Sequence, residues 1–128
     1  MFSASMPPGS TAAALKSLEI IEEEPERIAK LWRNATFLRQ AMQHAGFDTG
    51  DSCTPIIPLI VGDDGLAFRF CVKSQEKGVF VNPVPGLSLR PGGALIRLSV
   101  MSTHEEHQLE RAAGILEKVG RELGIVNG

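Results

Sequence analysis

One arginine in this 128-residue sequence stands where a charged side chain could meet a ligand. Residues 94–101, ALIRLSVM, alternate in a way that predicts a strand with Ile96, Leu98 and Val100 on one face. Arg97 falls on the opposite, mixed face. A guanidinium is a planar fork of donors that holds a carboxylate with two parallel hydrogen bonds. The residues alone leave two interpretations open, a carboxylate-binding arginine and a solvent-exposed strand arginine.

The histidines and cysteines form no motif of a metal or redox site. His104 and His107 could share a helix face, but two ligands without a third nearby make a weak metal site, and His44 is remote in sequence. Cys53 and Cys71 lack CxxC spacing, so we expect both to be reduced and structural. The sequence also contains no Gly-rich phosphate loop, nucleophile elbow or carboxylate pair.

Two helices are predicted in the first part of the chain. Residues 11–23 are rich in helix formers, with Ser10 available as a cap and Pro25 just beyond the end. From Glu26 an apolar stripe recurs at three- and four-residue steps until Gly46, a residue type common at helix ends. The stripe consists of Ile28, Leu31, Trp32, Ala35, Leu38, Met42 and Ala45.

Short strands are predicted in the remainder. Residues 56–61 and 79–81 are apolar runs of strand length, and Pro58 indicates an edge or irregular position for the first. A proline-glycine loop is expected from 82 to 93, before the strand at 94–101.

Two further helices separate and follow these strands. The first is expected to begin at Asp63 or Asp64 and to end before Gly78, with an inner face of Leu66, Ala67, Phe70, Cys71 and Ser74. Thr103 and Glu106 fit a capping box for the last helix. Its apolar stripe is Leu109, Ala112, Ala113, Leu116, Val119 and Leu123. The order predicts an α+β fold, a small antiparallel or mixed sheet with helices on one face.

Composition narrows the class of partner. Hydrophobic residues make up 43%, charged residues 22%, and the formal net charge is -2, which argues against a nucleic-acid-binding surface. No apolar run approaches the roughly 20 residues that cross a bilayer, and the first residues do not look like a signal peptide. We therefore expect a cytoplasmic protein.

Three segments resemble the carboxy-terminal region of the α-oxoamine synthases. They are FSASMPP at 2–8, the passage 26–63 with its LW-N and TPI-P-IVGD elements, and GVFVNPV at 78–84 followed by ALIRLSVMSTHEEHQL at 94–109. These synthases are fold-type-I pyridoxal-phosphate enzymes, among them 8-amino-7-oxononanoate synthase, 2-amino-3-ketobutyrate CoA ligase, 5-aminolevulinate synthase and serine palmitoyltransferase. The resemblance implies the small carboxy-terminal domain of such a transferase.

The resemblance also implies roles for individual residues. The family's strand arginine, here Arg97, binds the carboxylate of the amino-acid substrate. Ser3 matches a hydroxyl residue that reaches the cofactor phosphate of the neighbouring subunit, and Ser88 matches a position near the substrate. His104 matches a strand-end histidine, which we interpret as structural.

The same resemblance implies that part of the enzyme lies outside this chain. The family's cofactor-binding lysine, the aspartate at the pyridine nitrogen and the ring-stacking histidine all lie upstream of the FS-x-S-x-PP segment. We therefore expect residues 1–24 to be an interdomain segment with a helix, residues 25–128 to be the small domain, and the large domain to be absent. Because Met1 precedes a segment that is internal in full-length members, an engineered piece, a truncated reading frame or a metagenomic fragment is expected.

The expected function follows from that placement. The full-length enzyme would condense an amino acid with an acyl-CoA, using pyridoxal phosphate and assembling as a homodimer, while this chain alone would be inactive and bind no cofactor. Two alternatives stay open. One is a stand-alone α+β module for small-molecule binding or assembly, and the other is a fragment of another fold-type-I aminotransferase.

Overall fold

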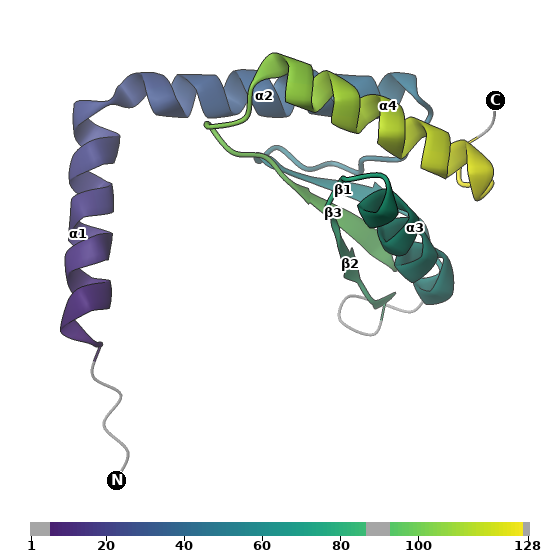
Figure 1. Cartoon of the computed structure of the whole chain (residues 1–128), viewed down its shortest axis with the longest axis horizontal. Helices are drawn as coiled ribbons and strands as arrows, with labels where there is room; N and C mark the ends of the chain where they lie inside the picture. Colours follow the sequence, from purple (N-terminus) through teal and green to yellow (C-terminus); the bar gives the residue numbers. More distant parts are fainter. Residues whose placement is uncertain (1–5, 87–92, 127–128) are drawn as a thin grey trace, which may run out of the picture.

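A computed structural model describes residues 6–86 and 93–126 of the chain. Within these residues the elements follow the predicted order: α1 (Pro8–Glu23), α2 (Pro25–His44), β1 (Ile56–Ile60), α3 (Asp64–Glu76), β2 (Asn82–Val84), β3 (Leu95–Ser99) and α4 (Glu106–Glu122). The strands form an antiparallel sheet in the order β1-β3-β2. Figure 1 shows α2 and α4 side by side over the sheet, with α3 beside β2. The α+β prediction is confirmed.

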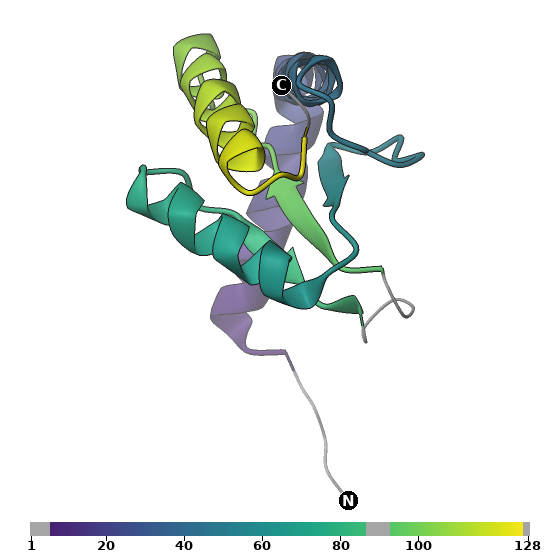
Figure 2. The same ribbon diagram turned by 90° about the vertical axis from the view of Figure 1, so that its right-hand side faces the viewer.

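Alternation along β3 decides which face of the sheet becomes core. Ile96 and Leu98 are buried, whereas Arg97 and Ser99 are exposed, as the sequence pattern predicts. The helices cover the buried face and leave the other face open (Figure 2). Prolines occur in both outer strands, Pro58 in β1 and Pro83 in β2, where a missing N–H costs no ladder bond to a further strand. The edge position predicted from Pro58 is confirmed.

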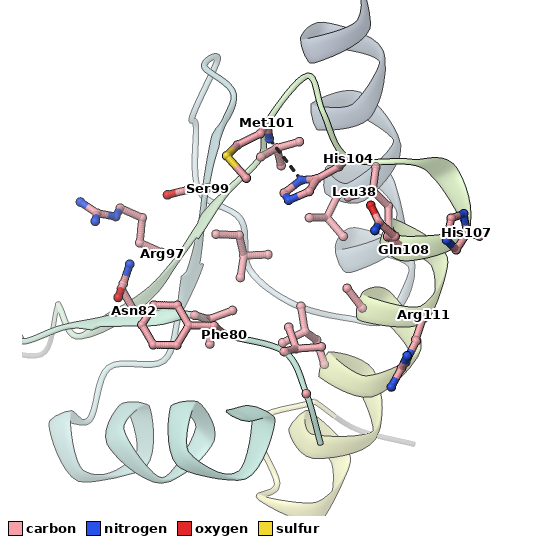
Figure 3. A pocket seen from close by; sticks show the side chains of 18 residues that line it. Leu38, Phe80, Asn82, Arg97, Ser99, Met101, His104, His107, Gln108 and Arg111 are labelled. Carbon is pink, nitrogen blue, oxygen red and sulfur yellow. Dashed lines mark hydrogen bonds between the residues drawn. The ribbon is translucent and has the colours of Figure 1, made fainter. Parts of the chain in front are cut away.

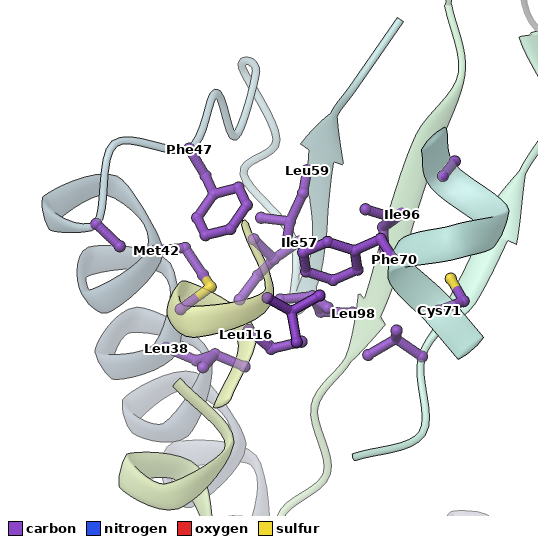
Figure 4. Packing of buried hydrophobic residues seen from close by; sticks show 14 of the residues in the cluster. Leu38, Met42, Phe47, Ile57, Leu59, Phe70, Cys71, Ile96, Leu98 and Leu116 are labelled. Atoms are coloured by element: carbon purple, nitrogen blue, oxygen red, sulfur yellow. The ribbon is translucent and has the colours of Figure 1, made fainter. Parts of the chain in front are cut away.

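The core lies between the sheet and its three covering helices (Figure 4). Phe70 from α3 is fully buried and meets Phe47 edge to face, with ring centroids 6.0 Å apart. Helices α2, α3 and α4 and strands β1 and β3 all contribute buried apolar side chains. The largest fully buried apolar side chains are Phe70, Met42, Ile57, Leu59, Ile96, Leu116 and Val119.

Helix α1 projects away from this body and contributes nothing to the core (Figure 1). None of its residues is buried, and Leu15, Leu18 and Ile21 are exposed. An isolated helix of this length has little stability in water, so α1 needs a surface to pack against. In the described parts of the chain, no helix is both long and apolar enough to pass through a bilayer.

The prediction of a strand at 79–81 is wrong. Pairing with β3 begins at Asn82 and continues to Val84, within the segment predicted as loop. The run Val79–Val81 instead leads from α3 to the sheet, burying Val81 and exposing Phe80. The alternation of residue types cannot locate a three-residue strand. Which residues pair with β3 depends on where α3 ends relative to the edge of the sheet.

Two predicted helix caps are also wrong, and a third is confirmed. Ser10 lies inside α1, because Pro8 starts the helix two residues earlier, a position that suits proline. The last helix begins at Glu106, where the backbone N–H of Glu105 donates to Oε1 of Gln108 at 2.9 Å, so the capping box is not Thr103 with Glu106. At α3, Asp63 accepts a hydrogen bond from the N–H of Leu66 at 2.7 Å, as predicted.

The apolar stripe of α2 reaches the core only along its second half. Ala35, Leu38 and Met42 are buried, whereas Ile28 and Trp32 are 40% and 44% exposed. The first turns of α2 extend past the sheet toward α1, so their apolar side chains have no layer beneath them (Figure 1). The apolar stripe predicted from the sequence is therefore present, but its first two exposed members, Ile28 and Trp32, do not belong to the core.

Candidate functional site

Arg97 occupies the central strand on the face that the helices leave open. Its Cα pairs with Pro58 of β1 and with Asn82 of β2, so both neighbouring strands fix its backbone. The flanking Ile96 and Leu98 are anchored in the core, while the Arg97 side chain is exposed. The sheet therefore presents a guanidinium from a rigid base, which is how a site on a strand holds its geometry.

Arg97 also lies at one end of a pocket (Figure 3). The cavity has a volume of about 680 Å³, within the range of roughly 300–1,000 Å³ usual for small-molecule sites. It opens between residues 78–82, the end of β3 and the first turns of α4. Because β2 pairs with β3 only as far as Arg97, residues 98–100 border the cavity on that side.

The lining of this pocket combines apolar surface with basic groups. Its polar side chains are Asn82, Arg97, Ser99, His104, His107, Gln108 and Arg111. Most of the other lining residues are apolar, and no aspartate or glutamate from the described residues lines the cavity. A cavity with this lining favours a ligand that is partly apolar and carries negative charge.

The turn between β3 and α4 is held by a buried asparagine. Nδ2 of Asn34 donates to the carbonyl oxygens of Met101 and His104, at 3.0 and 2.9 Å. Nδ1 of His104 accepts the backbone N–H of Met101 at 3.2 Å. With Nδ1 accepting, the ring carries its proton on Nε2, which leaves a donor on the ring's other side. These contacts agree with the structural role predicted for His104.

An ion pair reinforces the same turn from its outer side. Nζ of Lys30 on α2 lies 2.6 Å from Oε1 of Glu105, the residue that precedes α4. The hydrogen bond from Lys30, together with its positive charge, lowers the pKa of the Glu105 carboxyl. The Glu105 carboxyl is exposed and Lys30 is partly exposed, so this pair adds little stability.

The structure describes some of the residues predicted for the site and not others. The structure confirms that Arg97 faces away from the core, and it places Arg97 at the pocket. Ser3 and Ser88 lie outside the described residues. Sequence reasoning missed Asn82 and Phe80, which it assigned to a loop and to a strand interior. It also missed Arg111, although the four-residue spacing from His107 places both on one side of α4.

The described residues fit a substrate carboxylate better than the ring of pyridoxal phosphate. Among them, no lysine lines the pocket, so none could bind the cofactor covalently there. Lys16, Lys30, Lys73 and Lys77 instead pair with glutamates on the surface. The same part of the chain contains no cluster of three metal-ligating side chains. Covalent attachment of the cofactor would need a lysine from elsewhere.

Comparisons with known proteins agree with one another. The model of the family described as aminotransferase class I and II matches residues 1–116. An 8-amino-7-oxononanoate synthase of Symbiobacterium thermophilum is 43% identical over 126 residues, which are 98% of this chain and 32% of that protein. A serine palmitoyltransferase of Bacteroides ovatus is 38% identical over 126 residues, with the same two coverages.

Solved structures give the same picture. A high-resolution structure of SPT with a PLP internal aldimine aligns with a TM-score of 0.89 and 26% identity, covering 98% of this chain and 32% of that one. The serine palmitoyltransferase of Sphingomonas wittichii aligns with a TM-score of 0.87 and 29% identity, covering 99% and 32%. The chain thus spans about a third of the length of the proteins that it matches.

Proposed function

Because this chain belongs to the aminotransferase class I and II family, in its α-oxoamine synthase branch, we propose that it is the carboxy-terminal part of a pyridoxal-phosphate-dependent acyltransferase. The reaction would condense an amino acid with an acyl-CoA. The observation that carries this proposal is Arg97, held on the open face of the sheet beside a cavity, in a chain that aligns along nearly its whole length with such enzymes.

In this proposal Arg97 binds the carboxylate of the amino acid. Its guanidinium would form two parallel hydrogen bonds that set the direction of the bonds at Cα. Asn82, paired with Arg97 across the strands, lies at the same end of the pocket (Figure 3). The cofactor supplies delocalisation of the negative charge that develops at Cα. Residues of this chain would orient the substrate, and the groups that hold the ring would come from elsewhere in a longer protein.

The division of the chain is part of the same proposal. Residues 25–128 would be the small domain, and residues 1–24 would link it to a large cofactor-binding domain. The exposed apolar residues Leu15, Leu18 and Ile21 of α1 support this division, because a larger protein would cover them. These exposed apolar residues argue against a stand-alone module, in which α1 would be surrounded by water.

Three further assignments remain predictions. Ser3 would reach the cofactor phosphate of a neighbouring subunit, so the intact enzyme would be a homodimer. Ser88 would lie near the bound substrate. A cytoplasmic location would suit an enzyme whose substrates include acyl-CoA.

A chimaera tests the proposal directly. This chain would replace the aligned third of the Symbiobacterium thermophilum synthase, and the purified chimaera would be titrated with pyridoxal phosphate and then with amino acids, followed by visible absorbance. We expect the cofactor band to form in the chimaera and to respond to an amino acid. With Arg97→Ala the cofactor band should remain, while the dissociation constant of the amino acid should rise about 10- to 100-fold, as expected for losing a charge-assisted bond.

Two further variants test whether the loss of affinity is specific to the guanidinium of Arg97. Arg97→Lys keeps the charge without the planar fork and should recover only part of the affinity. Arg121→Ala, which removes a surface arginine of α4 paired with Glu117, should leave the affinity unchanged. Equal amino-acid affinity in the Arg97→Ala chimaera and the unsubstituted chimaera would exclude the proposed role of Arg97.

A further inference from the structure

We propose that the α4 side of the pocket binds the carboxylate of an aliphatic acid, at a position separate from Arg97. Figure 3 shows Arg97 and Asn82 at one end of the pocket and His104, His107 and Arg111 along the other. The Arg97 side chain extends away from α4 in this view. In this proposal the two ends of the pocket therefore belong to two different anions, one at Arg97 and Asn82 and the other at the α4 side.

The α4 side of the pocket, which includes His104 just before the helix, carries four side chains that can donate hydrogen bonds, beside the apolar Leu109, Ala112 and Leu116. The four are His104, His107, Gln108 and Arg111. Arg111 and His107 lie four residues apart on one helix face, and neither forms an ion pair within the described residues. Nδ1 of His104 is already occupied by the N–H of Met101, which leaves Nε2–H free to donate.

Gln108 adds a further donor, because its acceptor atom, like that of His104, is already used by a backbone N–H. Its Oε1 accepts the backbone N–H of Glu105 at 2.9 Å, so its amide NH₂ group is the part left for a ligand. With no acidic side chain from the described residues lining the cavity, these groups complement a negatively charged acceptor.

The apolar residues that line the pocket favour an alkyl chain as the uncharged part of the ligand. Phe80 and Met101 are 73% and 54% exposed, and Val79 and Val100 also line the cavity. A small hydrophilic anion such as phosphate would leave this apolar surface in water. An alkyl chain attached to the carboxylate would cover it, at a gain of about fourfold in affinity for each methylene buried. An aliphatic carboxylate satisfies both parts of the pocket.

Calorimetric titration of the 128-residue chain with decanoate tests this inference. We expect saturable binding that strengthens from octanoate to decanoate, and at least tenfold weaker binding of decanol, which lacks the charge. Replacing two basic residues of the α4 side together, His107→Gln with Arg111→Gln, should weaken decanoate binding at least tenfold. Phe80→Ser should weaken it as well, and because Phe80 is exposed, the fold should tolerate this change.

Two control variants separate this site from the proposed amino-acid site. Arg121→Gln removes a basic residue of α4 that does not line the pocket and should leave decanoate binding unchanged. Arg97→Gln should change it less than twofold, although it would disable the position proposed for the amino acid. The inference is overturned if decanoate shows no saturable binding below its micelle concentration. It is equally overturned if the double variant binds decanoate as tightly as Arg121→Gln does, or if binding depends on Arg97.

Discussion

Two glycines of α4 should respond in opposite directions to the same added methyl group. Gly120 is buried, and a Cβ built on it would lie 2.5 Å from Cζ of Phe47 and 3.1 Å from Cγ2 of Val126. Gly114, six residues earlier in the same helix, is exposed, and a Cβ there would have nothing within 4 Å. Comparing Gly114→Ala with Gly120→Ala therefore separates the effect of helix propensity on stability from the effect of side-chain packing within α4.

The expected magnitudes follow from these distances. Alanine in place of glycine inside a helix gains about 0.5–1 kcal/mol, so Gly114→Ala should stabilise the chain by that amount. At Gly120 the same gain is opposed by overpacking, which costs about 1–3 kcal/mol. Carbon atoms pack best at roughly 3.5–4.0 Å, so the ring of Phe47, which also contacts Phe70, would have to move by about 1 Å. We expect Gly120→Ala to be destabilising by about 1 kcal/mol.

Thermal unfolding followed by circular dichroism measures the difference. A gap near 2 kcal/mol between the variants corresponds to melting temperatures about 8 °C apart, with Gly114→Ala the higher. In a Phe47→Leu background the loss of stability caused by Gly120→Ala should be smaller, because leucine lacks the ring atoms that would clash with the added Cβ. If Gly120→Ala melts at or above Gly114→Ala, the packing of Phe47 against α4 is not as described.

Two more predictions concern a buried thiol and a buried amide. Burial raises the pKa of the Cys71 thiol from 9.0 to about 11, so the folded state holds this proton more tightly than the unfolded state. The free energy of unfolding should therefore fall between about pH 9 and pH 11, more steeply than in Cys71→Ala. At neutral pH a thiol reagent should modify exposed Cys53 well before Cys71, and equal rates would contradict the described burial. Asn34→Ala removes both donors to the turn at Met101 and His104 and should cost about 1–3 kcal/mol in urea unfolding, whereas no loss would mean that other groups hold the turn.

The site could be predicted from the sequence only in part. Alternation along residues 94–101 was enough to place Arg97 opposite the core, since side chains on a strand point to opposite faces. The pocket beside it joins residues 78–82, the end of β3 and α4, which lie far apart in the sequence. His107 and Arg111 line the same cavity as Arg97 only because α4 packs against α2 and α3, and no local pattern contains that information.

The same division applies to the fold. The residue types alone are enough to predict the order of helices and strands, the buried face of β3 and the apolar stripe of α4, because apolar residues recur there with the periods of a strand and of a helix. Tertiary packing sets the start of pairing at Asn82 rather than at Val79, and it leaves Ile28 and Trp32 exposed. Each of these depends on where one element ends relative to another, a distance through space that no stretch of sequence records.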